Sequence, residues 1–471
     1  MRDRRLSLRC CWWLLLVAVS LTAFKVFIVD EMHTPFRHPT LSSDGTLPGV
    51  EHPLERSYAD GLELIGYDQN AAASPTDDLV TVDLYWTVRE RPSRRYQSVV
   101  HLVGPEGFRW SKSDSFRPRG YQGAPPTDAW TPGRYALDSH EIEPLPGTPP
   151  GRYDVVLTVF DRETLAPLSV LDAAGQPTAP ELTLDQVTLT APRQPVDPSS
   201  LAIPHQRDMS LGSLTLLGAM FDPGEAAPGD PVWVTTVWRA EEQPQETLTL
   251  NLELLAPGGK TVAEYARPPA ASWHPTSAWR PGDVWRGQHL VHLPAELDTG
   301  TYTWTLSLSP SAASAVALSQ VSVTAPDRTF SPPAVDIETQ APLGKLVTLV
   351  GARVEPTAKD LTPGAIVTVA LVWRAEAETS ISYRVFVHLT GPDGELVAQS
   401  DGVPAAWGRP TTGWLPGEYV TDVHTLKVPE AVPPGPLALQ VGLYAPGGER
   451  LTTPGGATAV PLTTVMIRGK E

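Results

Sequence analysis

Apolar and polar residues alternate along short segments of this chain, with the period of two that is typical of β-strands. In residues 81–88, the side chains of Val82, Leu84, Trp86 and Val88 share one face, and polar residues occupy most of the other. The same alternation recurs in residues 153–159, 248–254, 302–308 and 383–389. A sheet with one apolar face has to be covered on that face, so the pattern predicts pairs of sheets packed face to face.

The phrase Pro-Thr-x-x-Trp-x-Pro-Gly occurs three times, at residues 126–133, 275–282 and 410–417. A tryptophan in a predicted strand precedes each phrase, and a glycine follows 21 residues after each loop tryptophan. The strand tryptophans are Trp86, Trp238 and Trp373, and the loop tryptophans are Trp130, Trp279 and Trp414. Matched spacing across three segments indicates three tandem copies of one structural unit.

The Pro-Gly pair in each phrase predicts a type II turn, because proline presets φ and glycine tolerates a positive φ. We expect the adjacent tryptophan to fold back and close the open end of its sandwich. The alternative is that this tryptophan forms a flat platform for a ligand.

The chain is therefore predicted to be all-β, with three tandem immunoglobulin-like β-sandwich modules behind a single N-terminal transmembrane helix. Its 50 prolines and 37 glycines agree with a fold rich in turns. The predicted divisions are a cytoplasmic tail (1–9), a transmembrane anchor (10–29), a stalk (30–56), module 1 (57–192), a linker (193–208), module 2 (209–326), a linker (327–342) and module 3 (343–469).

The first 30 residues predict the anchor. Four arginines precede an almost unbroken apolar run from Cys10 to Val29, which is about long enough to cross a bilayer as a helix. Arginines before the run place the N-terminus in the cytoplasm and the bulk of the chain outside the bacterial plasma membrane. The alternative is a cleaved signal peptide, although Leu21-Thr22-Ala23 is a poor cleavage site.

Charge and cysteine content narrow the function classes. The whole chain has a net charge of −17, and its first 30 residues are basic, so the remainder is more acidic still. Such a surface repels nucleic acid, which excludes it as a partner. The two cysteines, Cys10 and Cys11, lie in the predicted span, so the exported part has no disulfide.

The phrases L-x-G-Y, V-H-L-x-G-P-x-G, P-T-x-x-W-x-P-G and P-P-G-x-Y resemble exported bacterial repeats over residues 57–469. Those repeats are β-sandwich modules that follow the membrane region of GT-C-type glycosyltransferases, relatives of the protein mannosyltransferases. The chain has one predicted span and lacks the catalytic portion of such enzymes. The resemblance therefore implies a glycan-related envelope setting, and no catalytic residue is carried over.

Motifs for catalysis, cofactors and metals are missing from the sequence, including G-x-S-x-G, H-E-x-x-H and G-x-G-x-x-G. We therefore expect no enzyme activity, no cofactor and no metal site. A glycoside-active enzyme is the remaining alternative, since paired carboxylates need only spatial proximity, and Glu141 and Glu143 are its candidates.

Aromatic residues outside the repeated positions are the candidates for glycan binding, because sugar rings stack on exposed flat side chains. They are Trp110, Tyr121, Trp233, Trp273, Trp285 and Trp407. The alternative for each is edge packing and loop anchoring. The function expected is that of a non-catalytic cell-envelope interaction or structural protein, and the alternative is a carbohydrate-binding accessory of a membrane glycosyltransferase.

Overall fold

The structure is a computed structural model that describes residues 17–24, 41, 47, 49–112, 126–203, 206–310, 314–356 and 361–468. Residues 17–24 are helical, and within the described ranges no helix is both long and apolar enough to cross a membrane. The rest of the predicted anchor, residues 10–16 and 25–29, lies outside the described residues, as does Tyr121.

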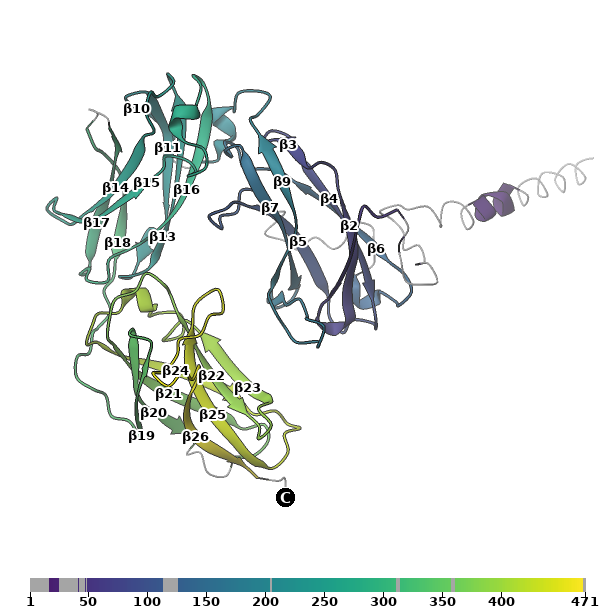
Figure 1. The fold of residues 1–471 in the computed structure, drawn as a ribbon, viewed down its shortest axis with the longest axis vertical. Helices are drawn as coiled ribbons and strands as arrows, with labels where there is room; N and C mark the ends of the chain where they lie inside the picture. Colours follow the sequence, from purple (N-terminus) through teal and green to yellow (C-terminus); the bar gives the residue numbers. More distant parts are fainter. Residues whose placement is uncertain are drawn as a thin grey trace, which may run out of the picture.

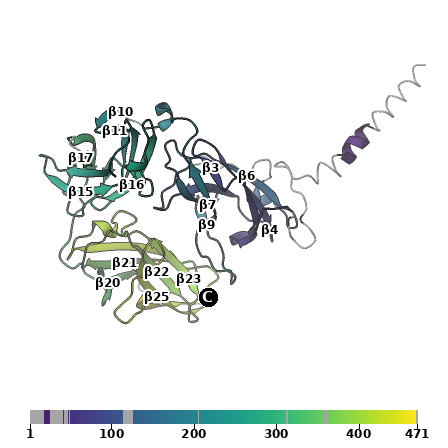
Figure 2. The same ribbon diagram turned by 45° about the horizontal axis from the view of Figure 1, so that its top comes forward.

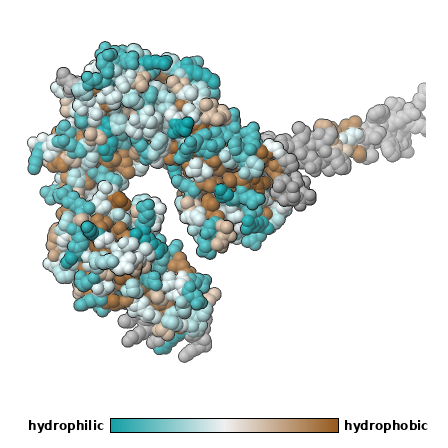
Figure 3. All heavy atoms as spheres, viewed as in Figure 1, coloured by the Kyte–Doolittle hydropathy of each residue, from teal (hydrophilic) through white to brown (hydrophobic). Residues whose placement is uncertain are grey.

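Over the described ranges, strands form six sheets, which pack in three pairs along the chain. Figures 1 and 2 show the pairs in an arc, with the second pair between the first and the third. On the face drawn in Figure 3, hydrophilic and hydrophobic residues are interspersed over all three pairs. The prediction of an all-β chain built from sandwiches is confirmed at this level.

The first sheet pair spans residues 52–190. One sheet has the order β1 (His52–Ser57), β2 (Leu62–Gln69), β4 (Val80–Val88) and β6 (Ala136–Ile142). The other has the order β3 (Ala73–Pro75), β9 (Glu181–Thr190), β7 (Gly151–Asp161) and β5 (Tyr96–Val103), with β8 (Pro167–Leu168) also paired to β7.

The second sheet pair spans residues 206–323. One sheet has the order β10 (Gln206–Leu211), β11 (Leu214–Asp222), β13 (Pro231–Ala240) and β16 (Val284–His292). The other has the order β12 (Glu225–Ala226), β18 (Val316–Val323), β17 (Gly300–Ser309), β14 (Thr249–Leu255) and β15 (Thr261–Arg267).

The third sheet pair spans residues 337–467. One sheet has the order β19 (Ile337–Leu343), β20 (Val347–Glu355), β21 (Ile366–Ala375) and β24 (Tyr419–Lys427). The other has the order β23 (Leu396–Gly402), β22 (Arg384–Thr390), β25 (Gly435–Tyr444) and β26 (Val460–Ile467).

The three pairs share the order of one four-stranded sheet and of the three long strands of the other, differ in the edge strands of that second sheet, and have one kind of core. In each pair a large hydrophobic cluster takes its residues from both sheets, so the apolar faces meet as the alternation predicts. The strand tryptophans Trp86, Trp238 and Trp373 are each fully buried in these clusters. Burial of such large rings makes them the main contributors of apolar contact area.

A β-bulge marks the start of each copy. The register of the second strand shifts immediately before Gly66, Gly218 and Gly351. A Cβ at Gly351 would lie 2.3 Å from the Ile337 carbonyl oxygen, so no larger residue fits there without movement. The glycine that recurs in the sequence is therefore the residue that lets the edge strand approach the bulge.

A buried threonine explains why the repeated phrase begins with Pro-Thr. The hydroxyls of three threonines accept backbone N–H groups at the start of β5, β14 and β22, strands of the opposite sheet. The donor–acceptor distances are 2.8 Å from Tyr96 to Thr127, 2.8 Å from Leu248 to Thr276 and 2.9 Å from Tyr383 to Thr411. Each threonine opens a short 3-10 helix, and its carbonyl accepts the N–H of the loop tryptophan. The phrase thus ties one sheet of a pair to the other.

The loop tryptophans close the ends of the sandwiches as expected. Trp130, Trp279 and Trp414 are 4%, 0% and 1% exposed. The glycines of the following Pro-Gly turns have φ values between 79° and 88°, which L-residues rarely adopt. The expected positive φ is therefore present, and the buried rings leave no platform for a ligand at these positions.

Both predicted linkers and the predicted stalk contain ordered structure. Residues 193–208 include the 3-10 helix η4 (Pro198–Leu201), and Leu201 and Ile203 are buried against the second sheet pair. Strands β10 and β19 begin inside the predicted linkers, and β1 begins inside the predicted stalk. These edge strands carry several polar residues, and β1 and β19 also contain a proline, which hides their alternation in the sequence.

Replacing Thr276 with valine keeps the side-chain shape but leaves the Leu248 N–H buried without an acceptor. We expect the free energy of unfolding of the second sheet pair to fall by about 1–3 kcal/mol. Thr276→Ser keeps the hydroxyl and loses one methyl group, so it should cost only about 0.8 kcal/mol. Chemical denaturation followed by tryptophan fluorescence measures both, and equal losses would contradict the role of the hydroxyl.

Candidate functional site

The loop from Val403 to Pro410 presents an exposed tryptophan. Three successive residues, Ala405, Ala406 and Trp407, have φ values of 53°, 53° and 73°, which is left-handed backbone without glycine. The Trp407 N–H bonds to the Val403 carbonyl at 3.0 Å, so the loop coils on itself. Trp407 is 64% exposed, the highest fraction among the described tryptophans.

A buried chain of polar contacts holds this loop in place. The Ala405 N–H donates to Asp422 Oδ1 at 2.7 Å, and Asp422 Oδ2 lies 2.9 Å from His424 Nε2. The other ring nitrogen, His424 Nδ1, lies 3.0 Å from Ser400 Oγ. Asp422 is 1% exposed and His424 is 6% exposed, so water does not compete for these contacts.

One charged side chain lies against the Trp407 ring, and further polar side chains follow it along the same sheet face. The Arg384 guanidinium carbon lies 5.6 Å from the ring centroid, a cation–π contact. Arg384 is paired in register with Tyr444, whose hydroxyl lies 3.4 Å from Asp401 Oδ2. Burial raises the pKa of Tyr444, the nearby Asp401 raises it further, and Arg384 opposes the change. Asp401 Oδ1 also lies 3.4 Å from His388 Nε2.

An Asp-x-His pattern underlies the anchoring of the loop and was missed in the sequence. It begins two residues after the partner of the strand tryptophan, at Asp138 in β6 and at Asp422 in β24. In the second copy Gly287 replaces the aspartate, because a Cβ there would lie 2.2 Å from the Pro269 carbonyl oxygen. Equal spacing in two copies is the signal that would have found it.

In the third copy Ser400 and Asp422 lie on opposite nitrogens of His424, the order of a catalytic triad, but Asp422 and His424 are buried and hold the loop at Ala405. The first copy also joins a serine to its Asp-x-His pair, and its geometry is not that of a triad. Ser98 Oγ donates to Asp138, and both side chains meet the same nitrogen of His140, Nε2, at 3.1 and 3.0 Å. A triad needs the acid and the nucleophile on opposite ring nitrogens. Asp138 and His140 are each 5% exposed, so this cluster ties the two sheets together inside the sandwich.

Trp273 closes the junction between the first and second sheet pairs. Its ring makes edge contacts with Trp110 and Tyr153, at centroid distances of 6.1 and 6.0 Å. A Cβ at Gly151 would lie 2.5 Å from Trp273 Nε1, and one at Gly104 would also touch the ring. These two glycines therefore make room for a tryptophan of the next sheet pair.

Arg286 fixes the same junction through backbone carbonyls. Its Nε donates to Pro146 O at 3.0 Å and its Nη2 donates to Leu201 O at 2.7 Å, while its N–H bonds to Gly147 O at 2.7 Å. Burial lowers the pKa of Arg286 to about 10, so the side chain stays charged at neutral pH. A buried guanidinium held by carbonyls from both sides disfavours separation of the two sheet pairs.

The junction between the second and third sheet pairs uses the third copy of the repeated phrase. Thr412 Oγ1 donates to Gly229 O at 2.6 Å. The backbones of Gly229 and Gly413 approach so closely that a Cβ at Gly413 would lie 2.2 Å from the Pro228 carbonyl oxygen. The other two copies have alanine, Ala129 and Ala278, at the position of Gly413.

A buried carboxylate reinforces this second junction. Glu418 is 0% exposed, and its Oε2 accepts from Arg328 Nη1 at 2.6 Å, while Arg409 pairs with its other oxygen. Arg328 also donates to the carbonyls of Gly413 and Ala295, which lie in the third and second sheet pairs. Each oxygen of the Glu418 carboxylate is paired with one arginine. Removing either arginine would therefore leave one oxygen of a buried carboxylate without its charged partner.

The remaining glycan candidates have different surroundings. Trp110 is 1% exposed and Trp285 is 2% exposed, so the expectation of exposed rings is wrong at both, because junction and core contacts cover them. Trp273 is half-buried in the junction described above. Trp233 is 47% exposed, with an edge contact of 5.7 Å to Phe108 of the first sheet pair.

The carboxylates considered for glycoside hydrolysis have ordinary surface surroundings. Glu143 pairs with Lys112, and both Glu141 and Glu143 are exposed. Across the described ranges, no group of three or more His, Cys, Asp or Glu side chains is arranged to hold a metal ion.

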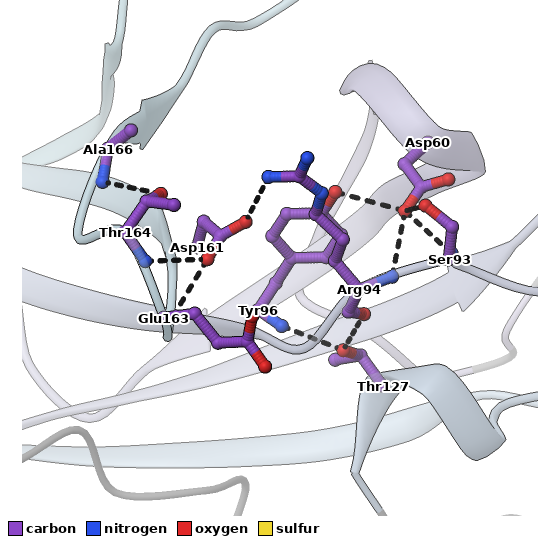
Figure 4. Close-up of polar contacts among 9 residues, drawn as sticks. All are labelled: Asp60, Ser93, Arg94, Tyr96, Thr127, Asp161, Glu163, Thr164 and Ala166. Atoms are coloured by element: carbon purple, nitrogen blue, oxygen red, sulfur yellow. Dashed lines mark hydrogen bonds and ion pairs between the residues drawn. The ribbon is translucent and has the colours of Figure 1, made fainter.

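Figure 4 shows a polar cluster at one end of the first sheet pair. Asp161 accepts hydrogen bonds from the Thr164 N–H at 3.0 Å and from Arg94 Nη1 at 2.9 Å. Nearby, Asp60 Oδ2 accepts from the Tyr96 hydroxyl at 3.0 Å. The Thr164 N–H and Arg94 lower the pKa of Asp161 to about 2. The cluster satisfies its own charges, and we interpret it as a structural clamp on these loops.

Comparisons with known proteins do not assign a family. No family model matches the chain, and no curated protein matches it. Among solved structures, the three N-terminal domains of the bacteriophage RB49 Highly Immunogenic Outer Capsid protein are similar over 88% of this chain and 100% of that chain, at 7% identity and a TM-score of 0.20. The Yersinia pseudotuberculosis adhesin InvE is similar over 56% of this chain and 60% of that chain, at 12% identity and a TM-score of 0.19.

A Corynebacterium diphtheriae protein described as membrane-anchored is similar over 87% of this chain and 92% of that chain, at 11% identity and a TM-score of 0.15. None of these likenesses assigns an activity or a ligand to this chain.

Asp161→Asn should change how stability depends on pH. The folded-state pKa of about 2 lies below the unfolded value of about 3.9, so the carboxylate stabilises the fold above pH 4 and this contribution is lost as pH falls toward 2. The difference in unfolding free energy between the parent chain and Asp161→Asn should be constant above about pH 5 and shrink below about pH 4.

Chemical denaturation between pH 2 and 7 measures this difference. Glu163→Gln is the matched control, because it removes a neighbouring exposed carboxylate and keeps the backbone N–H that bonds to Asp161. A difference that does not vary with pH would contradict the assignment.

Proposed function

We propose that this chain is a membrane-anchored, extracytoplasmic array of three β-sandwich modules, one for each sheet pair, that acts as a non-catalytic interaction or structural protein of the bacterial cell envelope. The observation that carries the proposal is the pair of interlocked junctions. Modules joined by flexible linkers move independently by default. Here a tryptophan, a buried arginine and a glycine–glycine backbone contact hold neighbours together. An array of this kind holds its surface loops at set distances.

The N-terminal sequence supports the proposed location. Its arginines and apolar run are those of a single-pass anchor with the N-terminus in the cytoplasm. The acidic charge of the rest of the chain suits an exposed, soluble surface. The repeats' resemblance to modules of membrane glycosyltransferases is compatible with a setting among envelope glycans.

A second candidate function is that of a carbohydrate-binding accessory of a separate membrane glycosyltransferase. It is favoured by the exposed Trp407 ring on a loop that buried contacts hold in place. The two functions differ in their partner: the first needs only a surface for another envelope component, whereas the second needs a sugar.

Gly413→Ala should open the second junction without unfolding the third module. The substitution installs the residue that the other two copies carry, but its Cβ would collide with the Pro228 carbonyl at 2.2 Å. Small-angle scattering of the detergent-solubilised chain should show a broader distribution of interatomic distances. Gly447→Ala, at a glycine with no atom within 4 Å, is the matched control and should scatter like the parent. Identical scattering of all three proteins would contradict the fixed junction.

The proposed topology is tested on cells. With a C-terminal epitope, the full-length chain should stay in the membrane after carbonate extraction, and added protease should remove the epitope from cells whose inner membrane is intact. These outcomes follow because a spanning helix leaves the bilayer only with detergent. Recovery of a soluble chain that begins near Phe24 would establish a cleaved signal peptide instead.

A further inference from the structure

We infer that the surface around Trp407 is a binding site for a neutral hexopyranose unit of a glycan. The inference rests on the second candidate function, carbohydrate binding, and names its site and ligand class. The apolar C–H face of the sugar would lie on the indole ring, and its hydroxyls would meet the polar side chains of the outer face of the sheet formed by β23, β22 and β25.

The backbone of the loop is the first argument. Left-handed φ costs about 1–2 kcal/mol for each non-glycine residue, and Ala405, Ala406 and Trp407 adopt it in succession. Such strain persists only where the surroundings enforce it, and it gathers at functional sites. In the second copy the equivalent alanines, Ala270 and Ala271, are not among the residues with positive φ. The strained form is therefore specific to the loop that exposes its tryptophan.

The second argument is that the loop is held in this form before any ligand arrives. Asp422 accepts the Ala405 N–H, His424 contacts Asp422, and Ser400 contacts the other ring nitrogen of His424. A preorganised aromatic ring loses little conformational entropy on binding. A single sugar unit binds weakly, and its binding free energy would not offset the entropy cost of ordering a flexible loop. A loop that is already ordered therefore suits such a ligand.

The third argument concerns what surrounds the ring. Protein-binding hot spots centre on an apolar patch from which water is excluded. Trp407 instead has Arg384 against its ring, followed by Tyr444 and Asp401 along the same sheet face. Phe386, on this same face, is 1% exposed and is covered by Arg450, so it adds no apolar surface. Donors and acceptors beside one flat ring match a sugar, which has apolar C–H groups ringed by hydroxyls.

Comparison with the second copy gives the fourth argument. Trp273 lies in the matching loop of the second copy. Its ring packs against Trp110 and Tyr153 of the neighbouring sheet pair. The hydrogen bonds of the second junction given above are made by Thr412, Gly413 and Arg328, and Trp407 takes part in none of them. The matching loops of both copies therefore carry an aromatic ring, and in the third copy that ring is 64% exposed.

The test measures sugar binding by the purified full-length chain in detergent. The probes are six-unit oligosaccharides of glucose, mannose and galactose, in α- and β-linked series, followed by calorimetry and tryptophan fluorescence. At least one series should bind, and Trp407→Ala should weaken that binding about tenfold or more. Trp407→Phe should retain part of it, and Asp401→Asn should reduce it by removing an acceptor.

Trp233→Ala is the matched control, because Trp233 is the other described tryptophan that is more than a third exposed, and its removal should leave binding unchanged. Circular dichroism verifies the fold of each variant. Failure of all the probes to bind, or equal binding by Trp407→Ala, would overturn the inference. Self-association that Trp407→Ala abolishes, with no sugar bound, would also overturn it and assign the ring to a protein contact. Neither result depends on the cellular topology or on the junctions, so the first proposed function is judged separately.

Discussion

A sheet with a single apolar face has to be covered over its whole area, including the open end where two sheets diverge. In this chain a threonine hydroxyl and a tryptophan ring meet that need together. The hydroxyl of Thr276 holds the start of the opposite sheet, and the ring of Trp279 lies buried behind it. Because the closing element is a loop between sheets, it lies at the surface where a neighbouring sheet pair is reached. The segment around the Pro-Thr-x-x-Trp-x-Pro-Gly phrase therefore closes the core of its own sheet pair and also lies where it can contact a neighbouring pair.

Copies of this segment have diverged where they meet different neighbours. The second copy has Trp273 and Arg286 turned toward the first sheet pair. The third has Thr412 and Gly413 turned toward the second. The Asp-x-His pair shows the same divergence, since it is kept in the outer copies and lost at Gly287, where a carbonyl occupies its space. The cores are alike because each has to cover the apolar faces of two sheets. The surfaces differ because each copy contacts a different sheet pair.

Much of the fold could be predicted from the sequence, since strand alternation and three spaced tryptophans depend on local pattern and repetition. The edge strand at Ile337–Leu343 was missed because its polar residues and proline hide its period. Exposure of aromatic rings could not be predicted, as Trp110 and Trp273 are covered by residues more than a hundred positions away. Trp407 was a candidate, but its strained backbone and its link to Asp422 depend on tertiary structure alone.

Gly413 also has a consequence for how such a protein can evolve. Repeats of similar cores can in principle be duplicated, deleted or exchanged, because each needs only its own interior. Here the third unit has a glycine where its sisters have alanine, and only that glycine admits the neighbouring turn at Gly229. Exchange of the third unit for either sister would carry a methyl group into that contact. The units thus share a sequence pattern but are not interchangeable, and their order along the chain is part of what the sequence has to specify.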